Sequence, residues 1–399
     1  MKIKTAINLL ESYWRDVIVI ALAVGALLAL LWFRIGTLSG GITDAESQIL
    51  KRFSDGGIGI RAMLEDPIYL PYNTLLQALQ KLGALNITSL RLISSLVGVA
   101  AAISFYAVLK KWHTDRVAIL GTILFVTSSW FLQTARMGTP DVLYLALIIF
   151  FFAGIWLQHS RHRSKLLGFL LVGACFLLYV PGLIWFVVLG GVWQFKRISK
   201  ELSRVHPGTI ILYALGGMVL LLPLIWAVVN DIAVLKTVLG LPSALPPISD
   251  FIKNLLSIPS QIFLNGIPDA QRWLAGLPLL DVFSIVMFII GVYWYGSRFQ
   301  LDRTTVFAVV LLMGSFLIAL GEHISITLLM PFVYLIIAAG ITYMLSEWFY
   351  VFPRNPIART LGVALITSAV LLTSFYHLNL YYRAWPNAPE TKTSLQQRP

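Results

Sequence analysis

The chain has 399 residues, of which 58% are hydrophobic and only 12% are charged. Soluble domains contain about 25% charged residues, so the composition excludes an ordinary soluble enzyme and predicts an all-α polytopic membrane protein. The net charge of +12 reflects the basic residues that orient the chain in the membrane, so it indicates no nucleic-acid partner. The single cysteine, Cys175, excludes a disulfide framework and a thiolate metal site.

About eleven apolar runs are long enough to cross a hydrocarbon core of about 30 Å, which takes roughly 20 residues each. The predicted spans are 17–33, 90–109, 117–135, 141–158, 166–180, 182–195, 208–229, 278–295, 304–320, 324–345 and 358–378. The segments between them are too short for a separate soluble domain. We therefore predict one membrane domain covering residues 1–399.

The basic residues indicate how the chain is oriented. With a cytoplasmic N-terminus, the inner segments carry 17 of the 30 basic residues and 6 of the 18 acidic residues, which satisfies the positive-inside rule. The predicted location is the plasma membrane, with multiple passes. Because eleven is an odd number of spans, we expect an extracytoplasmic C-terminus.

Two extracytoplasmic loops are long, residues 34–89 and 230–277. In the first, apolar residues recur at helical spacing from Ile42 to Phe53 and again from Leu75 to Leu82, which predicts two amphipathic helices lying in the membrane interface. The glycine-rich run 56–59 separates them. The second loop is rich in proline and is expected to cover a cavity. The tail after Tyr382 is expected to be short and mostly disordered.

The first acidic cluster, Thr43-Asp44-Ala45-Glu46, follows the first span. Thr43 with Glu46 three residues later fits a capping box, and Asp44 in the first helical turn suits the helix dipole. A carboxylate fixed at a helix start beside the bilayer is also well placed to act as a general base. Both readings stay open for Glu46, and the functional one is favoured for Asp44.

The second cluster runs from Arg136 to Asp141 between the third and fourth spans. Thr139, Pro140 and Asp141 are typical of a helix start, but Arg136 is not explained in this way. It forms either a simple ion pair with Asp141 or half of a phosphate clamp.

Further candidates lie at predicted outer span ends. Glu65-Asp66-Pro67 stands between the two amphipathic helices, where Asp66 is also a plausible cap. Tyr69 fits the aromatic belt of the interface as well as a substrate site. Glu322 and His323 occupy a tight outer turn, where a lone histidine is more often a surface residue. The sequence lacks a Walker loop, an HExxH motif and a nucleophile elbow, so a substrate activated beforehand would supply the energy.

The arrangement resembles the integral-membrane glycosyltransferases of the GT-C type, in particular the protein O-mannosyltransferases and the aminoarabinose transferases to lipid A. Asp44 matches the family's acidic motif in the first outer loop, with Glu46 displaced one position from the usual adjacent acid. Ala135-Arg136 through Asp141 matches the motif before the fourth span. Glu65-Asp66-Pro67 resembles a short Glu-Lys-Pro or His-Pro-Pro element.

The sequence departs from the family at two of these places. Asp66 replaces a basic or histidine residue. His323 stands where relatives show Arg or Lys before a Tyr-Leu-Leu-Pro-like span, here Thr327-Leu328-Leu329-Met330-Pro331. Both departures concern the contacts to the donor phosphate.

The resemblance implies transfer of a sugar, with inversion, from a polyprenyl-phosphate donor to a hydroxyl of a glycolipid, glycan or protein at the outer membrane surface. It implies Asp44 and Glu65 as catalytic residues. The implied substrate-binding residues are Glu46, Asp66, Tyr69, Arg136, Asp141, Glu322 and His323. A cation would stabilise the departing phosphate, and this cation is Arg136, His323 or a divalent metal ion, Mg²⁺ or Mn²⁺, bridged by Asp44 and Asp141.

Two other classes of function stay open. A multispan transporter or flippase of lipid-linked substrates would perform no covalent chemistry, but it would be expected to carry ionisable residues inside its spans, and the predicted spans hold almost none. A structural partner of a cell-envelope complex is the other alternative. In each case membrane lipids surround the protein.

Overall fold

The computed structural model describes residues 2–38, 41–54, 60–159 and 163–395. Helix makes up 79% of the structure, and the described residues form no strand. The helices of the first half are α1 (Lys2–Trp32), α2 (Asp44–Ser54), α3 (Ile60–Glu65), α4 (Leu70–Lys81), α5 (Ile87–Trp112), α6 (Asp115–Thr127), α7 (Ser129–Arg136), the 3₁₀ helix η1 (Pro140–Leu145), α8 (Ala146–His159), α9 (Arg163–Leu177) and α10 (Leu183–Leu202).

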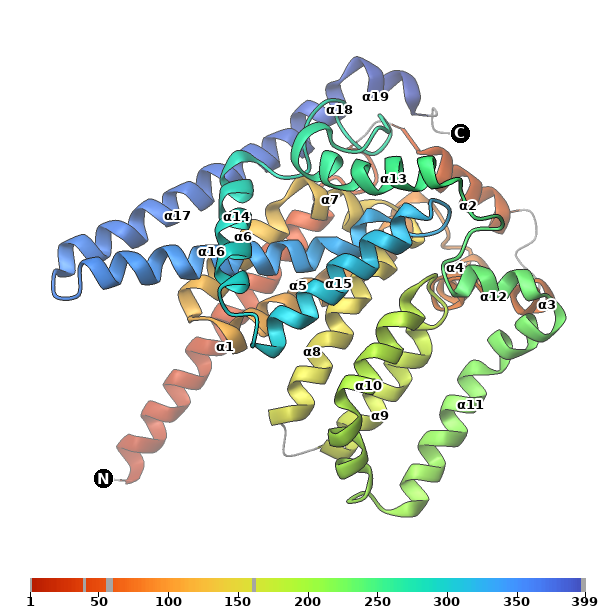
Figure 1. The fold of residues 1–399 in the computed structure, drawn as a ribbon, viewed down its shortest axis with the longest axis horizontal. Coiled ribbons are helices and arrows are strands. Elements are labelled where there is room, and N and C mark those ends of the chain that lie inside the picture. Colours follow the sequence, from red (N-terminus) through yellow and green to blue (C-terminus); the bar gives the residue numbers. More distant parts are fainter. Residues whose placement is uncertain (1, 39–40, 55–59, 160–162, 396–399) are drawn as a thin grey trace.

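The second half of the described chain is also helical. Its helices are α11 (Pro207–Asn230), α12 (Ile232–Val238), α13 (Ile248–Ser260), α14 (Val282–Gly296), α15 (Asp302–Ala319), α16 (Met330–Val351), α17 (Pro356–Asn379), α18 (Trp385–Asn387) and α19 (Pro389–Ser394), with the 3₁₀ helix η3 (Ile326–Leu329) and the π-helical turns η2 (Gln261–Asn265) and η4 (Leu380–Ala384). Figure 1 shows α16 crossing the molecule between α17 and α15, with α9, α10 and α11 grouped to one side.

The prediction of a polytopic membrane protein is confirmed, but the prediction of eleven spans is wrong. Within the described residues, six helical stretches are long and apolar enough to cross a membrane, or seven if the bent pair α6 and α7 counts as one. The six are Ile87–Trp112, Pro140–Leu157, Pro207–Asn230, Asp302–Ala319, Ile326–Val351 and Pro356–Asn387. The sides of the membrane on which the two termini lie stay a prediction. The expected outer C-terminus depended on an odd number of spans, and the candidate spans number six or seven.

Four predicted spans do not qualify. The apolar helices Val17–Trp32, Leu166–Leu177 and Val282–Gly296 are shorter than a span requires, and α10 carries Lys196, Arg197, Lys200 and Glu201 in its last two turns. Hydropathy alone thus counted apolar helices that are too short to cross a membrane or that end in several charged residues.

The predicted span 117–135 is broken into α6 and α7 by a bend of 60°. Ser128 stands at the bend in an extended conformation and caps α7, since its Oγ accepts a hydrogen bond from Phe131 N at 3.1 Å. A capping serine in the middle of an apolar run thus starts a second helix.

A junction beneath this bend ties three helices together. Asp281 caps α14 through Phe283 N, accepts a hydrogen bond from Thr373, and lies 3.3 Å from His377 Nε2. His377 Nδ1 in turn lies 3.1 Å from Ser129 Oγ. These contacts bring α7, α14 and α17 together at one end of the bundle.

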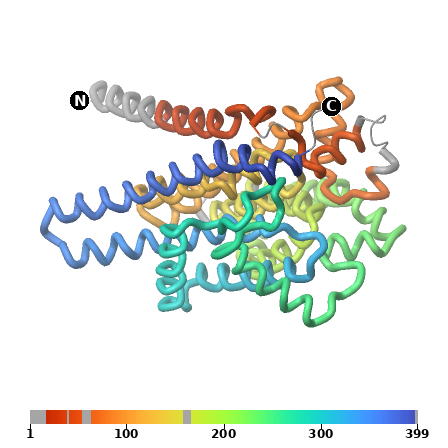
Figure 2. Tube along the Cα trace, turned by 90° about the horizontal axis from the view of Figure 1, so that it is seen from above, coloured from red at the N-terminus to blue at the C-terminus, as the bar shows by residue number. Residues whose placement is uncertain are grey.

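Helices α14 and α16 approach each other closely at two glycines. A Cβ atom added at Gly340 would lie 1.9 Å from Met287 O, and one added at Gly291 would lie 2.0 Å from Ile336 O. Backbone atoms cannot yield as a flexible side chain can, so these positions require glycine. Such contacts between small residues are typical of helix packing in membranes. Figure 2 shows the neighbouring hairpin of α16 and α17 from above.

Replacing Gly340 with alanine is expected to destabilise the fold by about 1–3 kcal/mol, because the added methyl group forces the two helices apart. Thermal unfolding in detergent measures the effect. Gly216→Ala is the matched control, since a Cβ there meets no atom within 4 Å. Equal melting temperatures for the two variants would contradict the close packing of α14 on α16.

In the first loop, both predicted amphipathic helices are present, as α2 and α4, with the additional short helix α3 between them. The glycine-rich run 56–59 that was expected to separate them lies outside the described residues. Phe53 and Leu76 are buried against the bundle, whereas Leu75 and Leu82 are exposed. Each helix therefore packs one apolar face on the protein.

The prediction of a mostly disordered tail is wrong. The chain after α17 continues through η4, α18 and α19 to Ser394, and Trp385, Thr391 and Leu395 are buried. We call residues 380–395 the C-terminal segment. Aromatic side chains packed onto the bundle stabilise this short polar stretch, a long-range effect that local sequence does not reveal.

Candidate functional site

The predicted capping box at the start of α2 is confirmed. Thr43 N donates to Glu46 Oε2 at 3.1 Å, and Glu46 N donates to Thr43 Oγ1 at 3.3 Å. The reciprocal bonds satisfy two donors at the helix start. They also fix Asp44 at the first position of α2.

Glu46 is a buried connector between distant segments. Its side chain is 0% exposed, and it receives Arg91 Nε at 2.7 Å, Arg91 Nη2 at 2.8 Å and Gly138 N at 2.9 Å. Arg91 donates further to the carbonyls of Ile35 and Gly41. The first loop, α5 and the turn before η1 are thus joined through one carboxylate.

The pKa of Glu46 reflects two opposing effects. Burial raises it, but the hydrogen bonds and charge of Arg91, together with the main-chain donors of Gly138 and Thr43, outweigh burial and hold the pKa below its ordinary value of 4.5. The charged form is therefore the one that the folded protein stabilises.

This shift predicts a loss of stability in acid. A carboxyl group with a lowered folded-state pKa contributes stability that is fully present above the pKa of the unfolded chain and is lost as pH falls below it. The melting temperature should therefore fall more steeply below about pH 4.5 in the wild type than in Glu46→Gln, which has no group to titrate there. If the melting temperatures of the two proteins fall in parallel with pH, Glu46 and Arg91 do not form an ionised pair in the folded protein.

Asp44 faces the loop that follows η2. Asp44 N donates to Gln271 Oε1 at 3.0 Å, and Gln271 Nε2 donates to Asp44 Oδ2 at 2.9 Å. The side chain is otherwise exposed at the positive end of α2. Gln271 belongs to residues 266–281, which we call the strap.

Asp141 binds the next residue of the same strap. Arg272 Nη1 lies 2.8 Å from Asp141 Oδ2, and Arg272 Nε lies 3.7 Å from Asp269. The predicted helix start is present: Thr139 is the N-cap residue and Pro140 follows it, although the helix is 3₁₀. Asp44 and Asp141 thus converge on two consecutive residues, from loops almost 100 positions apart in the sequence.

Of the two alternatives for Arg136, the ion pair with Asp141 is not formed among the described residues, and Arg272 pairs with Asp141 instead. Arg136 is 3% exposed, its Nη2 donates to Phe33 O, and its guanidinium carbon lies 5.2 Å and 4.8 Å from the ring centroids of Tyr381 and Tyr382. Its Nε and Nη1 atoms are buried without a hydrogen-bond partner. Unpaired buried donors on a cation are costly, and they suit an anionic ligand.

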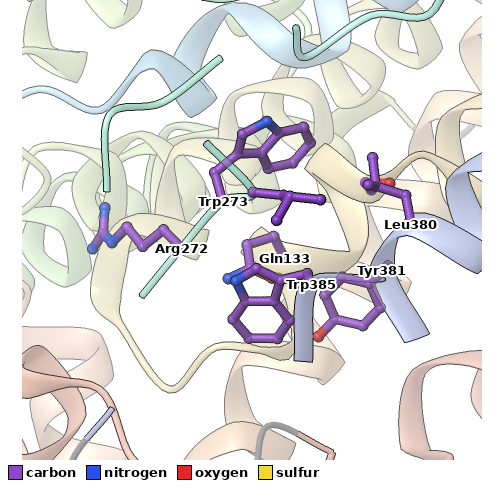
Figure 3. A pocket seen from close by; sticks show the side chains of 8 residues that line it. Gln133, Arg272, Trp273, Leu380, Tyr381 and Trp385 are labelled. Carbon is purple, nitrogen blue, oxygen red and sulfur yellow. The ribbon is translucent and has the colours of Figure 1, made fainter. Parts of the chain in front are cut away.

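Two small cavities lie beside these residues, each with about 10 Å³ of free volume, the size of about one water molecule. The first is lined by Ser129, Gln133, Arg272, Trp273, Leu274, Leu380, Tyr381 and Trp385. Figure 3 shows Trp273, Gln133, Trp385 and Tyr381 around it, with Arg272 extending to one side. The second is lined by Ile35, Leu38, Thr43, Arg91, Arg136, Met137, Tyr381 and Trp385. The stacked rings of Tyr381 and Trp385, 5.7 Å apart, stand between the two.

Glu65 and Asp66 lie near the end of α3. Glu65 is exposed, and Asp66 forms an exposed ion pair of 3.3 Å with Arg52 while accepting a hydrogen bond from Ile68 N. The cap reading of Asp66 fits this turn. The side chain of Asp66 is thus tied to Arg52 at the end of α2 and to the turn before α4.

Tyr69 is placed between α3 and α4 with φ of 57°, in the left-handed region that side chains seldom adopt. Burial and then the charge of Asp141 raise the pKa of its phenol, while a hydrogen bond with Tyr144 opposes the shift. Tyr69 therefore belongs to the neighbourhood of Asp141. Strained backbone is frequent at functional sites.

Glu322 and His323 face another loop. Glu322 accepts hydrogen bonds from Ser243 N at 2.8 Å and Ser243 Oγ at 3.0 Å, and His323 Nε2 lies 3.4 Å from Glu322. Only the main chain of His323 reaches η1, where its carbonyl accepts from Tyr144 at 2.8 Å. The structure thus connects this pair to the region of Asp141 through Tyr144.

The expected cation bridged by Asp44 and Asp141 has no matching donor set in the described part of the chain. No group of three or more His, Cys, Asp or Glu side chains gathers there. Asp44 is bonded to Gln271 and Asp141 to Arg272, whereas Mg²⁺ needs near-octahedral oxygen ligands. We therefore assign no chemical step to a metal.

Sequence reasoning missed five residues of this region: Arg91, Gln271, Arg272, Tyr381 and Trp385. One usable signal was Arg91, because a basic residue at the start of an apolar run requires a partner. The aromatic pair near the C-terminus was the other. The strap carried no distinguishing pattern.

Comparison with known proteins adds no relative to this description. No family model matches the chain, and no curated protein matches it either.

Proposed function

We propose that the protein transfers a sugar from a polyprenyl-phosphate donor to an acceptor hydroxyl at the end of the bundle that holds Asp44, Asp141 and Arg136. One observation carries the proposal: two carboxylates from separate loops converge on consecutive strap residues beside a buried arginine with unpaired donors. Transfer of a group from a phosphate requires a carboxylate to accept the proton of the acceptor and a cation to stabilise the departing phosphate.

In the proposed reaction, Asp44 is the general base. The acceptor oxygen attacks the anomeric carbon, its proton passes to the Asp44 carboxylate, and the bond from the anomeric carbon to the phosphate oxygen breaks with its electron pair going to the polyprenyl phosphate. Attack from the face opposite the leaving group inverts the anomeric centre. The exposed position of Asp44 at the edge of the strap leaves it open to an acceptor.

Arg136 is the proposed partner of the departing phosphate. The charge of its neighbour Arg91 is already matched by Glu46, whereas Arg136, which also lines the second cavity, keeps its Nε and Nη1 donors unused. A guanidinium binds phosphate with paired N–H donors. The apolar tail of the donor would rest on the exposed apolar side chains of the spans, in a plasma membrane with the site on the outer side.

The experiment uses the purified protein in liposomes with a radiolabelled polyprenyl-phosphate sugar and membrane extract as acceptor. Consumption of donor with transfer of label supports the proposal. Label that crosses the bilayer while the donor stays intact supports a flippase instead. If the donor is neither consumed nor moved across the bilayer, both functions are contradicted.

Arg136→Met should raise KM for the donor at least tenfold, since a charge-assisted hydrogen bond contributes about 1.5–3 kcal/mol. Arg52→Met is the matched control, because Arg52 is exposed and its ion pair with Asp66 is exposed as well. Equal donor KM values for the two variants would remove Arg136 from the phosphate site.

A further inference from the structure

The C-terminal segment covers both cavities of the proposed site. Tyr381 and Trp385 line each cavity, and Tyr381 and Tyr382 stack against the guanidinium of Arg136. Trp385 is 5% exposed and Thr391 is 1% exposed. The unpaired donors of Arg136 are therefore shielded from solvent by residues near the end of the chain.

The segment is fastened to the strap by two hydrogen bonds. Trp385 Nε1 donates to Ala270 O at 3.3 Å, and Gln271 Nε2 donates to Ser394 O at 2.8 Å. The same Gln271 nitrogen also donates to Asp44. One amide thus links the proposed base, the strap and the C-terminal segment.

Both covering elements begin at a π-helical turn, η2 before the strap and η4 before α18. Such turns interrupt regular helical bonding and often occur at functional sites. Free volumes of about 10 Å³ are far below the roughly 300–1,000 Å³ of pockets that hold organic ligands. A sugar phosphate reaches Arg136 only if this cover moves.

We propose that the C-terminal segment and the strap form a two-part lid over Arg136, hinged where α17 ends and η4 begins, which opens to admit the phosphate-bearing donor and closes to exclude water from it. This inference rests on the proposed function for its ligand. Its physical advantage is that an activated sugar is shielded from hydrolysis.

Two reporter cysteines test the lid, in a Cys175→Ala background. Thr391→Cys reports exposure of the segment, and Met137→Cys reports exposure of the second cavity, which Met137 lines. Lys392→Cys is the control, since Lys392 is adjacent to Thr391 but exposed. The rate of reaction with a small maleimide should be low at positions 391 and 137 and high at position 392.

Weakening the fastening should open both buried reporters together. Gln271→Ala removes three hydrogen bonds, one to Ser394 O and two with Asp44, so the rates at 391 and 137 should rise about tenfold while the rate at 392 changes less than twofold. Trp385→Phe, which keeps the packing and loses one N–H donor, should give a smaller increase of the same kind.

The outcomes separate the lid from the proposed function. A rate that rises at 391 but not at 137 means that the segment does not cover the cavity, and unchanged rates at both mean that the bonds do not fasten a lid; either result overturns the inference. These rates are measured without donor, so they stand even if no sugar is transferred. Added polyprenyl phosphate should lower the rate at 137 by occupying the cavity.

Discussion

Asp44→Asn is expected to lower the turnover of sugar transfer by about 10²–10⁴-fold, the usual contribution of a general base. Asparagine has the size of aspartate and can still bond to Gln271, so the start of α2 and its position against the strap are retained. It cannot take the proton of the acceptor hydroxyl. The effect should appear in kcat at saturating donor, with the donor KM nearly unchanged.

Asp66→Asn is the control for this measurement. Asp66 is also an acid of the first loop, but its ion pair with Arg52 is exposed, and exposed pairs contribute about 0–1 kcal/mol. Transfer by Asp66→Asn should stay within twofold of the wild type. If Asp44→Asn, expressed normally, transfers sugar as fast as this control, Asp44 is not the base.

Features that depend on a few neighbouring residues could be predicted from the sequence. The capping box of Thr43 and Glu46 and the helix start at Pro140 are examples, because each is set within four residues. The amphipathic helix α2 also follows from local spacing. Tertiary packing altered only the type of the helix at Pro140.

The number of spans could not be predicted, because hydropathy does not distinguish lipid from protein as the surrounding of a helix. The apolar window of the candidate span that includes α16 is 83% buried inside the protein, whereas that of α11 is 17% buried, yet their hydropathies are nearly equal. The short helix α14 is equally apolar but packs on α16 through Gly291 and Gly340. Which apolar runs are long enough to cross a membrane is decided by where the helices end and bend, as α14 and the α6–α7 pair show.

Of the candidate site, the sequence allowed us to predict the acidic residues but not the residues that join them. Asp44 and Asp141 are joined through Gln271 and Arg272, which lie more than 100 residues further along the chain. No local sequence pattern predicts a contact between residues so far apart in the chain. The burial of Trp385, next to η4, likewise depends on distant residues.

The second large effect concerns stability. Glu46→Gln should destabilise the fold by about 3–5 kcal/mol, the usual cost of leaving a buried charge without its partner. The amide keeps one acceptor, but its NH₂ group then faces two N–H donors, those of Arg91 Nε and Gly138 in one orientation or those of Arg91 Nη2 and Thr43 in the other. A lowered melting temperature at neutral pH in detergent measures the loss.

A double variant separates the buried charge from the lost hydrogen bonds. Arg91→Met alone leaves Glu46 unpaired and should cost as much as Glu46→Gln, whereas Glu46→Gln with Arg91→Met leaves no buried charge between α2 and α5. Because the cost of a broken buried pair lies mainly in the uncompensated ion, the double variant should be more stable than the sum of the two single losses predicts. Strict additivity would mean that Glu46 and Arg91 act independently, which their distance of 2.7 Å argues against.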